Sequence, residues 1–176
     1  MLIAGAIFLV VKTPLKLAST EVFPDDYNIK EIDLPIIQHF TVDSVNFSGV
    51  LINFGDNTLN DLDYSIELFD ENNNLLIFKE FKNYNSNLID LRFDMMSDSK
   101  GKQFTLKISS NKSSKVSLLL SNSFDDRNYI ENFDGVIRVN SLHYVKNYGY
   151  FWYICMFLTV ICILLVSLEG EIDVKK

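Results

Sequence analysis

Hydrophobic positions recur at every second residue between residues 34 and 144, which is the period of a β-strand whose two faces differ. In residues 89–95, apolar side chains at odd positions alternate with charged side chains at even positions. Short runs of this kind, separated by segments rich in Asn, Asp, Gly and Ser, predict about eight strands. They cover residues 34–40, 45–54, 63–69, 75–81, 88–95, 103–109, 116–120 and 135–142. The pattern therefore predicts an all-β domain over residues 34–144, an antiparallel β-sandwich or jelly roll.

Three details of this pattern make local predictions. Gly49 lies where the alternation changes phase, which predicts a β-bulge. The turn at residues 98–101 requires a positive φ angle, which we assign to Gly101. Phe93 and Phe104 flank that turn and, with Met95, are predicted to point into the core.

A second pattern begins after the predicted sandwich. No charged residue occurs between Asn147 and Leu168, and the run is apolar on every helical face. About 20 such residues span the hydrocarbon of a bilayer, so residues 147–168 are predicted to form a transmembrane helix, followed by a tail at residues 169–176. Aromatic side chains with polar tips favour the headgroup layer. The predicted membrane-interface residues are Tyr148, Tyr150, Trp152 and Tyr153.

The amino-terminal residues 1–11 are also apolar but too few to span a bilayer alone. The absence of a basic leading region disfavours a signal peptide. Two interpretations remain open: an uncleaved anchor over residues 1–18 that continues past Pro14, or a truncated anchor whose true start lies upstream. Residues 19–33 are charged and are predicted to form an irregular stalk.

Composition narrows the class of protein. The 176 residues carry a net charge of −7, which disfavours a nucleic-acid partner because such a partner requires a basic face. The two cysteines, Cys155 and Cys162, lie inside the predicted membrane helix, so a disulfide framework and a cysteine zinc site are disfavoured. The lipid bilayer is the first expected partner.

The order of several segments resembles a known kind of module. These segments are Ile36–Phe40, Phe47–Phe54, Asp63–Asp70, Leu91–Phe93, Asp98–Lys102 and Phe104–Ser110. Together they resemble the jelly-roll, carbohydrate-binding-like extracytoplasmic module of bacterial and archaeal membrane proteins associated with surface-glycan biosynthesis. The resemblance covers residues 34 to about 142. It implies a domain outside the cytoplasm with a cytoplasmic tail, and a glycan or a polytopic membrane protein as partner.

Candidate chemistry is sparse. The sequence lacks hydrolase and metalloprotease motifs, so we expect no enzymatic activity and no catalytic residue. His39 is placed in the first predicted strand and His143 after the last, and both are expected to be solvated or hydrogen-bonded rather than metal ligands. Asp90 and Asp94 would suit acid/base chemistry only in a cleft. No cofactor is expected, although the acidic loops would suit a structural Ca²⁺.

Aromatic side chains stack on sugar rings, and two tyrosines in predicted loops, Tyr84 and Tyr129, are the candidate ligand-binding residues. The preferred hypothesis is a membrane-anchored, non-enzymatic binding or accessory module for cell-envelope glycan assembly. The alternatives are a fragment or subunit of a polytopic glycosyltransferase-like membrane enzyme, and a purely structural surface protein.

Overall fold

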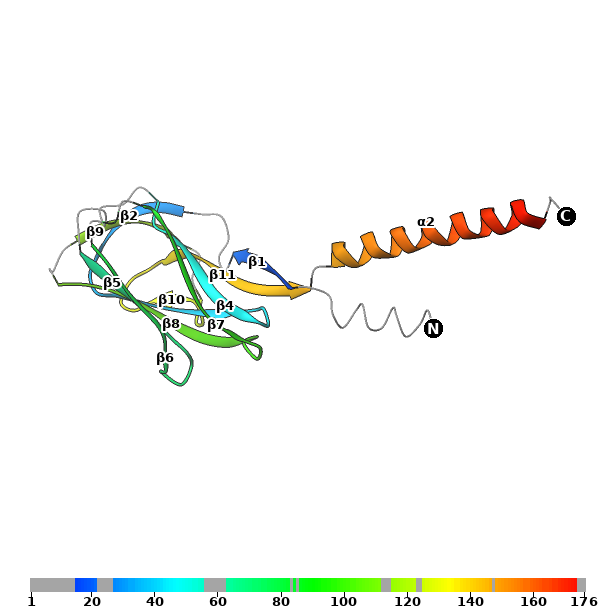
Figure 1. Cartoon of the computed structure of the whole chain (residues 1–176). Helices are drawn as coiled ribbons and strands as arrows, with labels where there is room; N and C mark the ends of the chain where they lie inside the picture. The colour runs from blue at the N-terminus through cyan, green and yellow to red at the C-terminus, as the bar shows by residue number, and fades with distance from the viewer. Residues whose placement is uncertain are drawn as a thin grey trace. The chain divides into compact units, whose positions relative to one another are not determined.

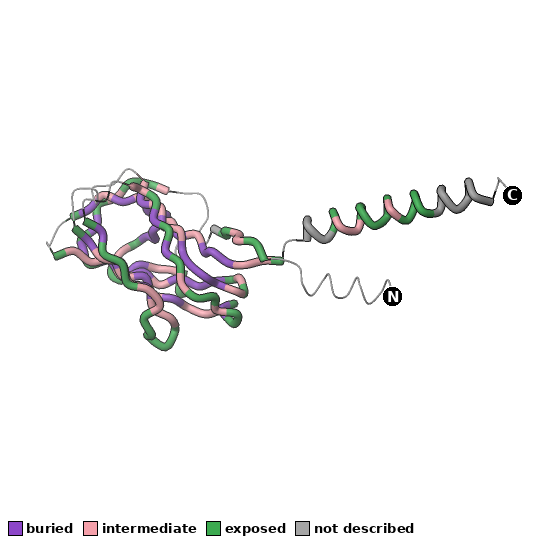
Figure 2. The backbone as a smooth tube through the Cα atoms, viewed as in Figure 1, coloured by how far each residue is buried: buried purple, intermediate pink, exposed green. Residues whose placement is uncertain are grey.

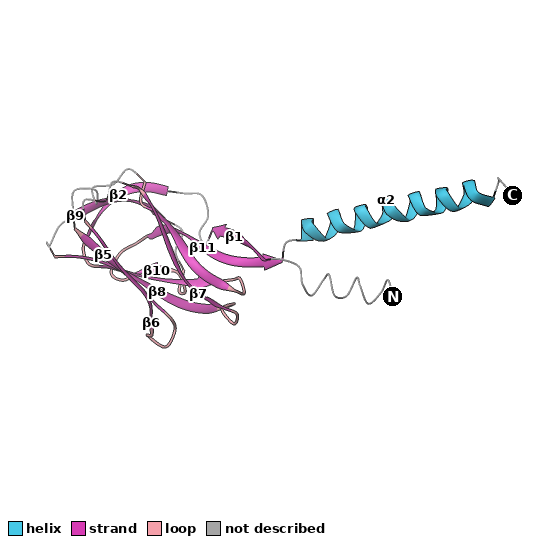
Figure 3. Cartoon of the chain, viewed as in Figure 1, coloured by secondary structure: helices cyan, strands magenta, loops and turns pink. Residues whose placement is uncertain are grey.

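The computed structural model describes residues 15–21, 27–55, 63–82, 84, 86–111, 115–122, 125–146 and 148–173. Residues 17–144 form one compact unit, an antiparallel β-sandwich, and the helix α2 (Tyr148–Asp173) belongs to a second unit. Figure 1 labels these elements, and Figure 3 separates strands from helix.

Two sheets form the sandwich. The six-stranded sheet has the order β2-β9-β11-β4-β7, with β1 pairing to β11, and the five-stranded sheet has the order β10-β3-β8-β5-β6. The strands are β1 (Leu15–Glu21), β2 (Tyr27–Asp33), β3 (Ile36–Val42), β4 (Phe47–Asn53), β5 (Tyr64–Phe69), β6 (Leu75–Phe81), β7 (Leu88–Met96), β8 (Lys102–Ser110), β9 (Lys115–Ser121), β10 (Tyr129–Ile130) and β11 (Val136–Lys146). From β2 to β9, consecutive strands alternate between the sheets except for the hairpin β5–β6, which gives a jelly-roll-like order with β11 inserted between β9 and β4.

The core lies between the two sheets and is made of buried residues from both. Figure 2 colours the backbone by residue burial and shows buried residues along the strands of the sandwich. Four phenylalanines, Phe40, Phe47, Phe54 and Phe104, are fully buried. The ring of Phe104 lies 4.6 Å from that of Phe47 and 5.9 Å from that of Phe40, measured between centroids. Burial of such rings stabilises the sandwich because apolar area is removed from water.

Each of the eight predicted strands corresponds to an observed strand, with bounds that differ by at most four residues. The predicted burial of Phe104 and the positive φ of Gly101, 78°, are confirmed. The inward orientation predicted for Met95 is wrong, because 45% of the residue is exposed. Phe93 is only partly buried, with its ring edge-to-face against Phe47 at 5.0 Å.

The cause is a bulge at the predicted position. The register between β4 and β7 shifts between the pairs Phe47↔Met96 and Gly49↔Arg92, so β7 carries two extra residues there. Alternation along β7 breaks at this point, which places Met95 outside. The bulge predicted at Gly49 is thus present, with the inserted residues on its partner strand.

Two strands lie where the sequence predicted an anchor extension and an irregular stalk. Residues 15–21 form β1, which pairs with β11, and the Thr20 carbonyl accepts a hydrogen bond from Ser141 Oγ at 3.3 Å. Residues 27–33 form β2, which pairs with β9 over seven residue pairs. In β2 only Ile32 is buried, so its alternation is too weak to mark a strand. The rest of the predicted anchor, residues 1–14, lies outside the described residues.

The carboxyl-terminal apolar segment is helical, as predicted, and α2 continues through residue 173 into the predicted tail. Within the residues that the structure describes, no helix is long and apolar enough to cross a membrane. Of the four predicted interface residues, Trp152 and Tyr153 are exposed, at 65% and 75%. The side chains of Tyr148 and Tyr150 lie outside the described part.

Candidate functional site

A row of polar and aromatic residues crosses the five-stranded sheet on the face turned away from the core, here called the outer face. Tyr129 of β10 pairs with His39 of β3, His39 pairs with Thr105 of β8, and Thr105 pairs with Phe69 of β5. Residues directly opposite in antiparallel strands point to the same side of a sheet. Adjacent strands lie about 4.8 Å apart, so the row extends for about 14 Å.

His39 is the centre of this row. Its Nε2 lies 2.9 Å from Glu131 Oε1, and its Nδ1 lies 3.1 Å from Thr105 Oγ1. The histidine side chain is 17% exposed and that of Glu131 is 44% exposed. The hydroxyl and the carboxylate thus hold the imidazole ring from both sides, and all three side chains reach solvent.

Tyr129 lies against this ring system, with its own ring centroid 4.7 Å from that of His39 and a tilt of 35° between the planes. The tyrosine is half-buried. The result is a fixed aromatic surface next to hydrogen-bonding groups, the combination that recognises a ligand with both apolar and hydroxyl-bearing faces.

The position of Tyr129 is set by the turn that precedes β10. Asp125 Oδ1 accepts hydrogen bonds from the backbone N–H groups of Arg127 and Asn128, at 2.9 and 2.8 Å. The Asn128 side chain in turn accepts the N–H of Thr41 at 2.8 Å, which ties the turn to β3. These bonds hold a two-residue strand that backbone pairing alone would position poorly.

The neighbouring row adds a second polar pair. Lys107 Nζ lies 3.0 Å from Glu67 Oε2, and Glu67 pairs across the strands with Phe78, which is 50% exposed. A hollow of about 310 Å³ adjoins the site at Glu131 and is lined by residues 32–36 and 130–133. The outer face therefore carries two adjacent rows of polar and aromatic side chains, and the hollow adjoins the row of His39 at Glu131.

Hydroxyl, imidazole and carboxylate also occur together in nucleophilic catalysis, where backbone N–H groups stabilise the developing oxyanion. Here β3 lies between β10 and β8, and β8 lies between β3 and β5. The N–H groups of β8 are therefore engaged by neighbouring strands. On its other edge, β3 pairs with the two residues of β10, and its Thr41 N–H donates to the Asn128 side chain.

The two candidate tyrosines are not brought together. Tyr129 lies in β10, at one edge of the five-stranded sheet. Tyr84 packs against Phe81 of β6, at the other edge, with ring centroids 4.9 Å apart and the planes nearly perpendicular. Beside Phe81, burial raises the pKa of Tyr64, and Tyr84 adds to this shift. A shallow polar pocket of about 210 Å³ adjoins Tyr64 and Phe81.

The remaining candidate residues are His143, Asp90 and Asp94. His143 lies within β11 rather than after the last strand, and it is buried with no hydrogen-bond partner for Nδ1. Asp90 pairs with Arg92 at 2.6 Å on an exposed face, and Asp94 is exposed. Among the described residues, no group of three or more His, Cys, Asp or Glu side chains could hold a metal ion.

Tyr129 was predicted from the sequence as a candidate ligand-binding residue, but Thr105 and Glu131, which lie beside it in the site, were not. The alternation does place His39 and Thr105 on the polar faces of their strands. Their pairing depends on the register between β3 and β8, which alternation alone does not give.

Comparisons with known proteins add little. No family model matches the chain, and no curated protein matches it. A structure of infectious bursal disease virus, Gx strain, is similar with a TM-score of 0.29 and 8% identity, over 76% of this chain and 36% of that chain. The crystal structure of the infectious bursal disease virus VP2 subviral particle gives 0.23 and 11%, over 76% and 41%. This chain spans less than half of either chain.

Both similarities are weak, and neither assigns a function to this chain. Of the resemblance expected from the sequence, the two-sheet antiparallel β-sandwich is present, and no family is identified.

Proposed function

We propose that this protein is a membrane-anchored, non-enzymatic module that binds a glycan on the outer face of its five-stranded sheet. The observation that carries the proposal is the Tyr129 ring, which is held against His39 beside the Thr105 hydroxyl and the Glu131 carboxylate. A sugar presents apolar C–H groups on one face of its ring and hydroxyl groups around its edge. The aromatic ring of Tyr129 can pack against the C–H groups, and the polar side chains can hydrogen-bond to the hydroxyl groups.

The length of the row supports an oligosaccharide rather than a single sugar. Tyr129 and Phe69 are separated by three strand spacings, about 14 Å, which accommodates more than one ring. The nearby side chains of His39 and Lys107 are paired with those of Glu131 and Glu67. A ligand rich in hydroxyl groups can hydrogen-bond to these side chains without separating either pair.

Membrane anchoring is the second part of the proposal, and it rests on the sequence of the carboxyl-terminal segment. Twenty-two consecutive residues, 147–168, carry no charge, and α2 covers this run as helix from residue 148 onwards. In the described part of α2, large apolar residues are exposed, including Phe157 at 66% and Ile163 at 60%. Lipid chains would cover such side chains without loss. We place the sandwich outside the cytoplasm and the tail inside.

Glycan binding is tested with the full chain in lipid nanodiscs on an array of cell-envelope oligosaccharides. The expected result is binding that Tyr129→Ala reduces by at least tenfold. The matched control is Phe78→Ala, which also removes an exposed aromatic ring from the outer face but outside the His39 row. Equal binding by all three proteins, or none by the unaltered chain, would refute the proposed site.

Topology is tested separately. Cys155→Ser and Cys162→Ser remove the native thiols, and single cysteines are then introduced by Lys115→Cys or Lys176→Cys. A membrane-impermeant maleimide on intact cells should label position 115 and leave position 176 unlabelled. The reverse result would place the sandwich in the cytoplasm.

The second candidate function is an accessory subunit of a polytopic glycosyltransferase-like membrane enzyme. The half-exposed apolar side chains of β6, Leu75 and Phe78, favour it, because an apolar edge strand suits a protein partner. Co-purification with a polytopic protein that Phe78→Lys abolishes would support this function.

A further inference from the structure

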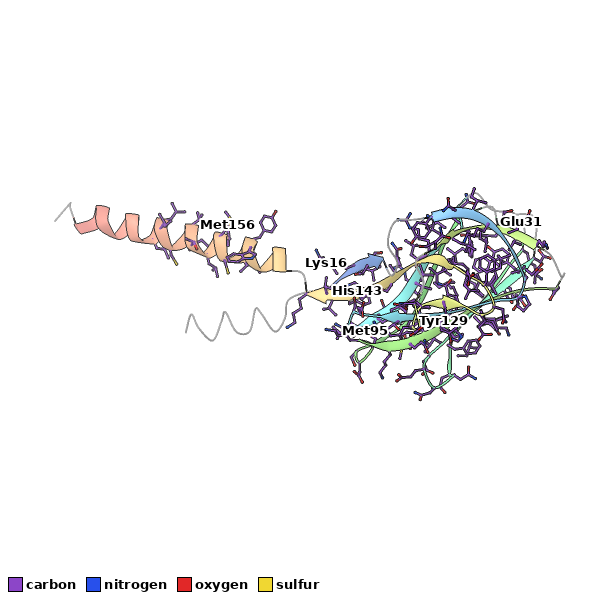
Figure 4. The ribbon with its side chains drawn as sticks, turned by 180° about the vertical axis from the view of Figure 1, so that it is seen from behind. Lys16, Glu31, Met95, Tyr129, His143 and Met156 are labelled. Atoms are coloured by element: carbon purple, nitrogen blue, oxygen red, sulfur yellow. The ribbon has the colours of Figure 1, made fainter. Side chains whose placement is uncertain are left out.

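The hydrogen bonds of His39 determine which groups of the outer face can donate to a ligand and which can only accept. His39 Nε2 lies 2.9 Å from Glu131 Oε1, and His39 Nδ1 lies 3.1 Å from Thr105 Oγ1. A neutral imidazole ring carries its proton on only one of these nitrogens, so the two partners decide the tautomer. Figure 4 draws the described side chains as sticks and labels Tyr129, whose ring packs against that of His39.

The carboxylate of Glu131 decides the position of the proton. An ionised carboxylate only accepts hydrogen bonds, so the neutral ring of His39 carries its proton on Nε2 and donates it to Glu131. His39 Nδ1 then has a lone pair and no proton, so the Thr105 hydroxyl donates to it. Because a hydroxyl has a single proton, Thr105 presents only lone pairs to a ligand.

Two polar groups beside Tyr129 are therefore acceptors without a proton to offer. The Glu131 side chain is 44% exposed and keeps acceptor sites beyond the one that His39 uses. Thr105 is partly exposed on the same face. A ligand group that lies against either residue must donate a hydrogen bond, as a hydroxyl, amide or ammonium group does. An ionised carboxylate or sulfate group has no proton to donate and would also meet a like charge at Glu131.

The charges around the site act in the same direction. The charged side chains that line the adjacent hollow are two carboxylates, Asp33 and Glu131. In the neighbouring row, the charge of Lys107 is matched by Glu67 at 3.0 Å. Arg127, in the turn before β10, comes directly after two exposed aspartates. An anionic ligand would therefore meet negative charge at the hollow and cations that carboxylates already offset.

We propose that the row containing His39 selects neutral and amino sugars, whose hydroxyl, amide or ammonium groups donate hydrogen bonds, and rejects acidic sugars that carry a carboxylate or sulfate. This inference rests on the proposed glycan binding and specifies the class of sugar at the same site. Tyr129 supplies the surface that packs on the sugar ring, while Thr105 and Glu131 determine specificity. An ammonium group is favoured because its hydrogen bond to Glu131 is charge-assisted.

The position of the proton is tested without a ligand. The full chain with isotope-labelled histidine is kept in detergent at about pH 8, where an ordinary histidine is neutral. The ring nitrogens of His39 are identified by comparison with the variant His39→Gln. Their nuclear magnetic resonance shifts should show a proton on Nε2 and a lone pair on Nδ1. A proton on Nδ1, with or without one on Nε2, would overturn the acceptor role of Thr105 whether or not a glycan binds.

Selectivity is tested on the oligosaccharide array, with neutral, amino and acidic members that share one linkage. In the unaltered chain, the neutral and amino members should bind at least tenfold more tightly than the acidic members. Glu131→Gln replaces an acceptor with an amide that also donates, and it should reduce this ratio at least fivefold. The matched control is Glu80→Gln, which removes a carboxylate from the outer face in β6, opposite Ser65, and should leave the ratio unchanged.

The outcomes separate this inference from glycan binding itself. Acidic members that bind as tightly as neutral ones would overturn the selectivity and leave glycan binding in place. An equal loss of selectivity in Glu80→Gln and Glu131→Gln would assign it to net charge and overturn the role of the hydrogen bonds. Binding of no member would refute the proposed function, and with it the selectivity.

Discussion

Gly49 allows a sharp test of the packing that shapes β7. A Cβ atom built on Gly49 would lie 2.3 Å from the carbonyl oxygen of Leu91 and 3.2 Å from the Cα of Arg92. Both are backbone atoms of the paired strand, so no side-chain rotation can relieve the contact. Gly49→Ala must therefore push β7 away from β4 by about 1 Å at the bulge.

The expected cost follows from this displacement. Overpacking a well-ordered site costs about 1–3 kcal/mol, and a clash with a hydrogen-bonded strand lies at the upper end, so we expect a loss of about 3 kcal/mol in the free energy of unfolding. With a urea dependence of about 2 kcal/mol per molar, the unfolding midpoint falls by about 1.5 M. The assay is urea unfolding of the full chain in detergent, followed by the β-sheet circular dichroism signal.

The matched control is Gly101→Ala. A Cβ atom at Gly101 meets nothing within 4 Å, but the residue has a φ of 78°. Only the cost of a left-handed conformation applies, about 1 kcal/mol, which shifts the midpoint by about 0.5 M. If Gly49→Ala destabilises the protein no more than Gly101→Ala, the close approach of β4 and β7 is not as described.

Three further predictions concern the core, alkaline stability and the anchor. Phe104→Ala should cost about 3–5 kcal/mol and Phe93→Ala about half as much, because only Phe104 is fully buried; equal losses in urea unfolding would contradict the strand phase. Burial raises the pKa of Tyr64, so the folded state holds that proton more tightly than the unfolded chain does. The stability that this difference contributes is complete below pH about 10 and is lost as the pH rises further. Tyr64→Phe should therefore reduce the fall in the urea unfolding midpoint between pH 9 and pH 11. If the variant shows the same fall, Tyr64 is not the cause of the alkaline loss of stability. Leu158→Asp and Ile161→Asp should each weaken membrane insertion by about 2.5–3.5 kcal/mol. If the variant carrying both substitutions stays in membranes after alkaline washing, the result would count against the anchor.

Alternation was sufficient to predict the strands whose two faces differ. In β8, buried Phe104 and Leu106 alternate with half-exposed Thr105 and Lys107, and the strand is found one residue longer at each end than predicted. Such strands border the core on one face and solvent on the other, so the sequence alone carries their phase.

Strands outside this rule could not be predicted. β2 buries one side chain of its seven, and β10 has two residues held by the side chains of Asp125 and Asn128. At the bulge, the two extra residues of β7 leave Met95 outside although the alternation predicts it inside. These features depend on hydrogen bonds between segments far apart in the sequence, which local patterns do not contain.

The candidate site shows the same division. Tyr129 is noticeable in the sequence as an aromatic residue in a polar segment, but its role depends on the pairing of β10 with β3. That pairing places Tyr129 beside His39 and brings Glu131, 92 residues further along the chain, within 2.9 Å of the imidazole. The chemical groups of such a site can be listed from the sequence, but the register between the strands determines which of them lie close together.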